Sequence, residues 1–152
     1  MRRALALIVA GLWCAALWFP SLGICGDRSV RWFDNSTVAV FGWGGVLYGE
    51  FGWFANIFLG RACYGLLRGR DPGIPAGLCG LLLGCSVLAP VKLPHDEAST
   101  ERLCAFGSGF WLWLCSLAIL VLGTVALAML ESAAPGFLRE FRSGQGRGGD
   151  GR

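Results

Sequence analysis

The chain has 152 residues, of which 55% are hydrophobic and 15% charged, and its mean hydropathy is +0.57. This balance excludes an ordinary soluble domain of this size, because too few charged residues remain to cover its surface. The net charge of +3 gives no reason to expect nucleic-acid binding. Four apolar runs explain the composition: residues 4–24, 38–67, 73–91 and 106–130. Each approaches or exceeds the ~20 residues that cross a bilayer. The sequence therefore predicts an all-α fold, an integral membrane four-helix bundle.

The first run follows Arg2 and Arg3, so a cleaved signal peptide is the alternative to a span. Its length and the bulky Trp13 and Trp18 favour a retained span. A cytoplasmic N-terminus places nine of the thirteen basic residues on the cytoplasmic side, as the positive-inside rule expects. Four spans then return the C-terminus to that side. We predict a multi-pass protein of the bacterial inner membrane, N-in/C-in, with the lipid bilayer as its surroundings.

The second run, 38–67, contains three polar residues, Glu50, Asn56 and Arg61. As one helix, it would place Arg61 about 16 Å along the axis from Glu50, too far for pairing. Arg61 is near enough to the cytoplasmic end to reach water, and Asn56 is expected to hydrogen-bond across a helix interface. Glu50 has two interpretations: a protonated or hydrogen-bonded structural group, or a proton or substrate site.

Glycines recur at helical spacing on one face of the second run and of the third run, 73–91. On a helical wheel each set falls in a narrow arc, so we expect the two spans to pack closely through these faces. The helix-packing candidates are Gly45, Gly49 and Gly52 in the second run and Gly73, Gly77, Gly80 and Gly84 in the third.

Seven cysteines form neither a CxxC pair nor a zinc-type cluster, so no metal or cofactor site is predicted. Cys25 follows the first run and Cys104 precedes the fourth, which places both on the outer, oxidising side. We predict a disulfide between them, and a Cα separation above about 7 Å would exclude it. The outer loop around His95 has acidic neighbours and is expected to be a solvated loop. The tail, 135–152, is predicted to be cytoplasmic and disordered at its end.

The string Phe51-Gly-Trp-Phe-Ala-Asn56 resembles one found in a family of small, uncharacterised bacterial inner-membrane proteins. Ile57 stands where that family's pattern has proline. The resemblance covers about twenty residues and implies a small multispan protein without indicating an activity. The first functional hypothesis is a non-enzymatic accessory or assembly component, with itself or another membrane protein as partner. The alternative is a small oligomeric transporter or channel that uses Glu50. A membrane enzyme would require Glu50, His95 and Asp34 to surround one cavity.

Overall fold

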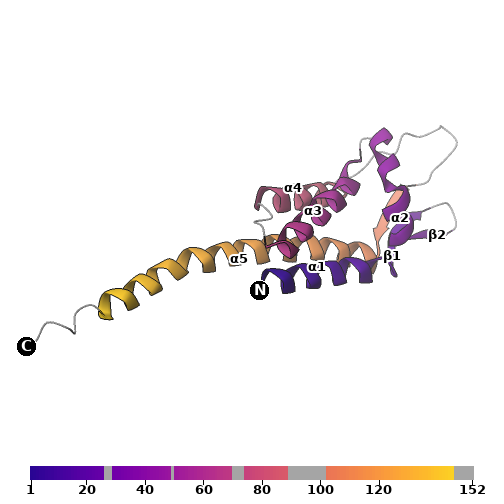
Figure 1. Ribbon diagram of the computed structural model, residues 1–152. Helices are drawn as coiled ribbons and strands as arrows, with labels where there is room; N and C mark the ends of the chain where they lie inside the picture. Colours follow the sequence, from indigo (N-terminus) through magenta and orange to yellow (C-terminus); the bar gives the residue numbers. More distant parts are fainter. Residues whose placement is uncertain (26–28, 49, 70–73, 89–101, 146–152) are drawn as a thin grey trace, which may run out of the picture.

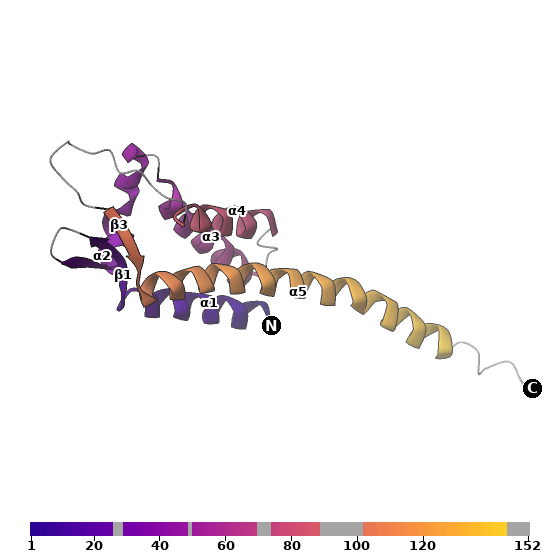
Figure 2. The same cartoon turned by 180° about the vertical axis from the view of Figure 1, so that it is seen from behind.

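The computed structural model describes residues 1–25, 29–48, 50–69, 74–88 and 102–145, with backbone only for 133–145. Figure 1 shows helices lying side by side, with a small sheet at one end. The last part of α5 extends alone beyond the other helices, as Figure 2 shows from behind. In chain order the elements are α1 (Arg2–Ala16), β1 (Pro20–Cys25), β2 (Val30–Asp34), α2 (Asn35–Phe41), the 3-10 helices η1 (Gly42–Tyr48) and η2 (Gly52–Phe54), α3 (Ala55–Leu67), α4 (Ile74–Ser86), β3 (Arg102–Phe106) and α5 (Ser108–Gln145).

The three strands form an antiparallel sheet in the order β2-β1-β3. Pro20, which has no backbone N–H to extend a helix, begins strand β1 soon after α1 ends at Ala16. Gly23 allows the strands to pack tightly, because a Cβ at this position would lie 3.0 Å from Val30 Cγ1. The disulfide predicted between Cys25 and Cys104 is present and joins β1 to β3, with a Cα separation of 5.8 Å.

The prediction of an all-α, four-helix membrane bundle is wrong, because the ends of two apolar runs form strands. The first run contains β1 as well as α1, and the start of the fourth belongs to β3. Among the described residues, one helical segment is long and apolar enough to cross a bilayer: Ser108–Ser132 of α5. At 15 residues, α1 is only about 22 Å long, less than the hydrocarbon thickness of about 30 Å.

The second run also differs from its predicted form, since it is not one continuous helix. It is divided into α2, η1, η2 and α3, and Glu50 lies between η1 and η2. The backbone N–H of Glu50 donates to the Gly45 carbonyl, over 2.9 Å. Gly42 permits the chain to fold over here, because a Cβ at this position would lie 2.7 Å from Trp53 Cδ1. The helical-wheel geometry that was used to place Glu50 and Arg61 therefore does not apply.

The core lies where α1, α3 and α5 meet. Val9, Leu66, Leu117 and Leu120 have no exposed surface there. At the end farthest from the sheet, the Arg2 guanidinium donates to both carboxylate oxygens of Glu131, at 3.0 and 2.6 Å. It also donates to the Gly69 carbonyl, over 3.0 Å, so one side chain joins the start of α1, the turn after α3 and α5.

The predicted glycine face of the third run packs mainly on α5. A Cβ on Gly84 would lie 2.9 Å from Leu117 Cδ1, while one on Gly80 would lie 3.2 Å from Phe58 Cβ of α3 and 3.5 Å from Leu117. Gly77 also faces α5. Gly49 and Gly73 lie outside the described residues. The second and third runs do approach closely, since a Cβ on Gly52 would lie 3.3 Å from the Leu83 oxygen of α4, and α5 shares the glycine face of the third run.

Candidate functional site

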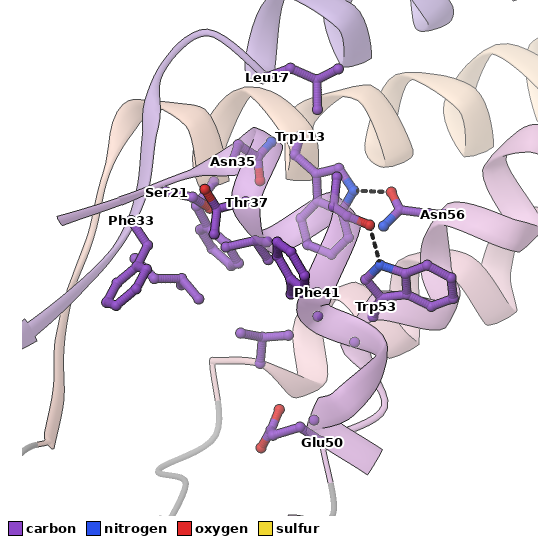
Figure 3. A pocket seen from close by; sticks show the side chains of 18 of the residues that line it. Leu17, Ser21, Phe33, Asn35, Thr37, Phe41, Glu50, Trp53, Asn56 and Trp113 are labelled. Carbon is purple, nitrogen blue, oxygen red and sulfur yellow. Dashed lines mark hydrogen bonds between the residues drawn. The ribbon is translucent and has the colours of Figure 1, made fainter. Parts of the chain in front are cut away.

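A pocket of about 370 Å³ lies between the sheet, α2 and the adjoining ends of α1, α3 and α5. Its wall is almost entirely apolar, and six of the lining residues are aromatic (Figure 3). They come from five elements, α1, β2, α2, η2 and α5, so the pocket exists only in the folded chain. We call it the aromatic pocket after these residues: Trp13, Phe33, Phe41, Trp53, Phe110 and Trp113.

Asn56 fixes two of the tryptophans. Its Oδ1 accepts a hydrogen bond from Trp13 Nε1 at 3.0 Å and another from Trp113 Nε1 at 2.8 Å. Because both indole nitrogens are donors only, the amide oxygen must face them. Asn56 at the start of α3 therefore connects α1 and α5 through their aromatic side chains. This agrees with the interhelical hydrogen bonding that the sequence predicted for Asn56.

Trp53 is fixed in a similar way by a backbone carbonyl. Its Nε1 donates to the Ala39 oxygen at 2.8 Å, which joins η2 to α2 (Figure 3). All three indole N–H groups around the pocket thus have acceptors within the protein. The rings are held in place, and none of these donors remains for a ligand.

Ser21 and Asn35 add polar groups to the wall near the sheet, together with Thr37 of α2. Ser21 and Asn35 are only 1% and 7% exposed, yet no hydrogen bond joins their side chains to any described residue. No buried side-chain nitrogen or oxygen atom among the described residues lacks a partner, so the polar atoms of these two residues reach the open space of the pocket. Their polar atoms are therefore available to a molecule in the pocket.

Glu50 lies at another part of the wall, as Figure 3 shows. It is half-buried, and desolvation raises the pKa of its carboxyl group above the ordinary value. Arg61 is exposed and does not line the pocket. Of the predicted glycines, Gly45 and Gly52 belong to the wall. Both are closely packed, because a Cβ on Gly45 would lie 3.0 Å from Glu50 Cβ and one on Gly52 would clash with Val87 Cγ2. Among the described lining residues, Glu50 is the only one with an ionisable side chain.

The enzyme alternative receives no support from the described part of the chain. Asp34 is exposed on β2 and does not line the pocket, and His95 lies outside the described residues. The described residues contain no group of three metal-binding side chains.

No family model, curated protein or solved structure matches this chain. The sequence did not predict the pocket, although Asn56, Glu50 and two pocket glycines are candidate site residues in it. Trp13 and Trp113 were overlooked as site residues because they are far apart in sequence. One signal was present: tryptophans in the first and last apolar runs both lie toward the end that carries the disulfide.

Proposed function

We propose that this chain is a non-enzymatic integral membrane protein, an accessory or assembly component that binds an apolar molecule in the aromatic pocket. The pocket carries the proposal. Small-molecule sites are typically concave and mostly apolar, with a few polar groups that orient the ligand. The aromatic pocket has this composition, and its volume of about 370 Å³ lies within the range of ligand sites.

Membrane anchoring by α5 is supported by the outer surface of the helices. The most apolar 18-residue stretch of Ser108–Ser132 has a mean hydropathy of 2.4. Large apolar side chains point outward from three helices, including Leu7 of α1, Leu82 of α4 and Leu122 of α5, each at least 66% exposed. Extended apolar surface of this kind is unfavourable in water and favourable against lipid. Trp111, near the start of α5, is 48% exposed, a placement typical of membrane interfaces.

The disulfide supports a position of the sheet on the outer side of the membrane. Disulfides persist in oxidising compartments, so the Cys25–Cys104 bond favours a sheet on the outer side of the membrane. The aromatic pocket, which lies against the sheet, would then open near the outer interface. A ligand could reach it from the outer leaflet or from outside the cell.

Anchoring is tested by placing a charge on the exposed face of α5. Leu122→Arg puts a guanidinium on the apolar segment, where a charged residue costs about 3 kcal/mol for insertion. We expect this variant to be lost from carbonate-washed membranes. Ser132→Arg, at the end of the same segment and also exposed, is the matched control and should stay. Retention of both variants at wild-type levels would contradict anchoring by α5.

Ligand binding is tested with para-bromo-neopentylbenzene, whose bromine quenches tryptophan fluorescence on contact. We expect saturable quenching that falls in Trp113→Phe, whose ring is only 7% exposed, and persists in Trp111→Phe. Val38→Phe should weaken binding by filling the wall, whereas Val40→Phe on the exposed side of the same helix should not. Quenching that does not saturate, or that is lost equally in both tryptophan variants, would overturn the proposal.

The alternative is a small oligomeric transporter that uses Glu50, and the position of this residue on the pocket wall supports it. A transporter would carry a pocket ligand across the membrane of proteoliposomes, and its rate would depend on a proton gradient. A binding component would retain its ligand. Uptake into vesicles that contain the wild-type chain, compared with Glu50→Gln, separates the two functions.

A further inference from the structure

We propose that the ligand of the aromatic pocket is an apolar cation, an amine or quaternary ammonium on an aromatic or aliphatic body, with Glu50 as its counter-charge. This inference rests on the proposed function and specifies its ligand class. It follows from three properties of the wall: its charge, the state of its hydrogen-bond donors and its aromatic content.

The charge of the wall excludes most anions. No lysine, arginine or histidine is among the described lining residues, and Glu50 supplies the one carboxyl group. An anionic ligand would place a second acid in a mostly apolar space without a cation to balance it. A cation would instead meet the Glu50 carboxylate in surroundings where partial burial strengthens their attraction.

The indole donors also argue against an anion. Anion sites normally aim N–H groups at the ligand, but the three pocket tryptophans give theirs to Asn56 and to the Ala39 carbonyl. The rings therefore contribute carbon surfaces and π-electrons. Aromatic walls are typical of sites for quaternary ammonium groups, in which cation–π attraction contributes to binding, and Glu50 adds one carboxyl group to this wall.

The buried polar groups fit the same ligand class. Ser21 and Asn35, whose side chains have no hydrogen bond to a described residue, can contact a polar group on the part of the ligand away from its ammonium group. In Figure 3 they lie toward the sheet, and Glu50 lies apart from them. The volume of about 370 Å³ suits a ligand of one or two rings better than a two-chain lipid.

The test compares two probes of the same shape that differ in charge. These are para-bromobenzyl-trimethylammonium and para-bromo-neopentylbenzene, in which carbon replaces the cationic nitrogen. Both are titrated into the full chain in a neutral detergent, with saturable quenching of tryptophan as the readout. The affinity of the uncharged probe, corrected for how each probe partitions into micelles, gives the affinity expected without a charge effect. We expect the cation to bind about tenfold more tightly than this reference value. Glu50→Gln should remove this preference for the cation over the uncharged probe.

Each outcome is decisive. If both probes bind with saturation and Glu50→Gln alters neither, the cation inference fails and the proposed binding function stands. If neither probe gives saturable quenching, the binding function fails as well. The comparison on the unaltered chain requires no variant, and Glu50→Asp, which keeps the charge, should retain the preference for the cation. An equal loss of preference in Glu50→Asp and Glu50→Gln would contradict the role of charge.

Discussion

Asn56 offers the sharpest test of the pocket's construction, because one amide oxygen accepts from two tryptophans. Replacement by leucine removes this acceptor and leaves the N–H groups of Trp13 and Trp113 without partners. A buried donor without a partner costs about 1–3 kcal/mol. Trp113 is only 7% exposed, whereas Trp13 is half-buried and can recover part of its bond with water. We therefore expect Asn56→Leu to lower the free energy of unfolding by about 2–4 kcal/mol.

The assay is equilibrium unfolding in neutral detergent micelles, followed by circular dichroism. The control combines Asn56→Leu with Trp13→Phe and Trp113→Phe, which removes both donors and their acceptor together. The combined variant leaves no donor without an acceptor, so it should be destabilised by less than the sum of the three separate changes; the smaller rings still leave voids that cost stability. The reasoning is refuted if Asn56→Leu unfolds like the wild type. It is equally refuted if the combined variant is destabilised by the sum of the three separate changes.

Three further predictions concern close packing, the disulfide and pH. Gly109→Ala should destabilise the fold by about 1–3 kcal/mol, because the added Cβ would lie 2.5 Å from the Phe19 oxygen. Gly60→Ala is the control: its Cβ would have no atom within 4 Å, so this variant should be neutral or stabilising in the same unfolding assay. Reduction of the disulfide, whose cysteines are 79 residues apart, should cost about 4–5 kcal/mol in the chain-entropy model; a Cys25→Ser/Cys104→Ser variant that still responds to reductant would contradict this. Burial raises the pKa of Glu50, so the folded state keeps this proton at pH values where the unfolded state has lost it. The free energy of unfolding should then fall as pH rises from the ordinary glutamate pKa through the folded one, and Glu50→Gln should remove that slope.

Local patterns in the sequence predicted part of this structure well. The apolar runs contain α1, α3, α4 and most of α5, because a strongly apolar helix can be recognised from the composition and length of its sequence. The disulfide was predictable because Cys25 and Cys104 each lie next to an apolar run, on the same expected side. Asn56 was correctly expected to bond across helices, since an amide in such a run needs a partner.

The sheet and the pocket were not predictable in the same way, because both depend on contacts between distant segments. Strand β1 pairs with β3, which begins at Arg102, and a short apolar strand cannot be told from the end of a helix by periodicity alone. The interruption of the second run at Glu50 also depends on a contact between distant segments. Only the tertiary contact between Trp53 and the Ala39 carbonyl shows that the run from 38 to 67 folds over. A helical wheel assumes a continuous helix, and the 3-10 helices remove that assumption.

The length of α5 gives the pocket a mechanical connection to the opposite end of the molecule. With 38 residues, α5 is about 57 Å long, so it extends well past a hydrocarbon layer of about 30 Å. Phe110 and Trp113, close to its start, are part of the pocket wall. Proline removes one helical hydrogen bond and bends a helix, and Pro135 lies within α5, so only the part before it acts as one rod. A tilt of about 5° at the pocket would displace the end of that part, about 40 Å away, by about 3–4 Å. In the proposed membrane setting, occupancy of the pocket on one side would thus be felt as movement of α5 toward the other.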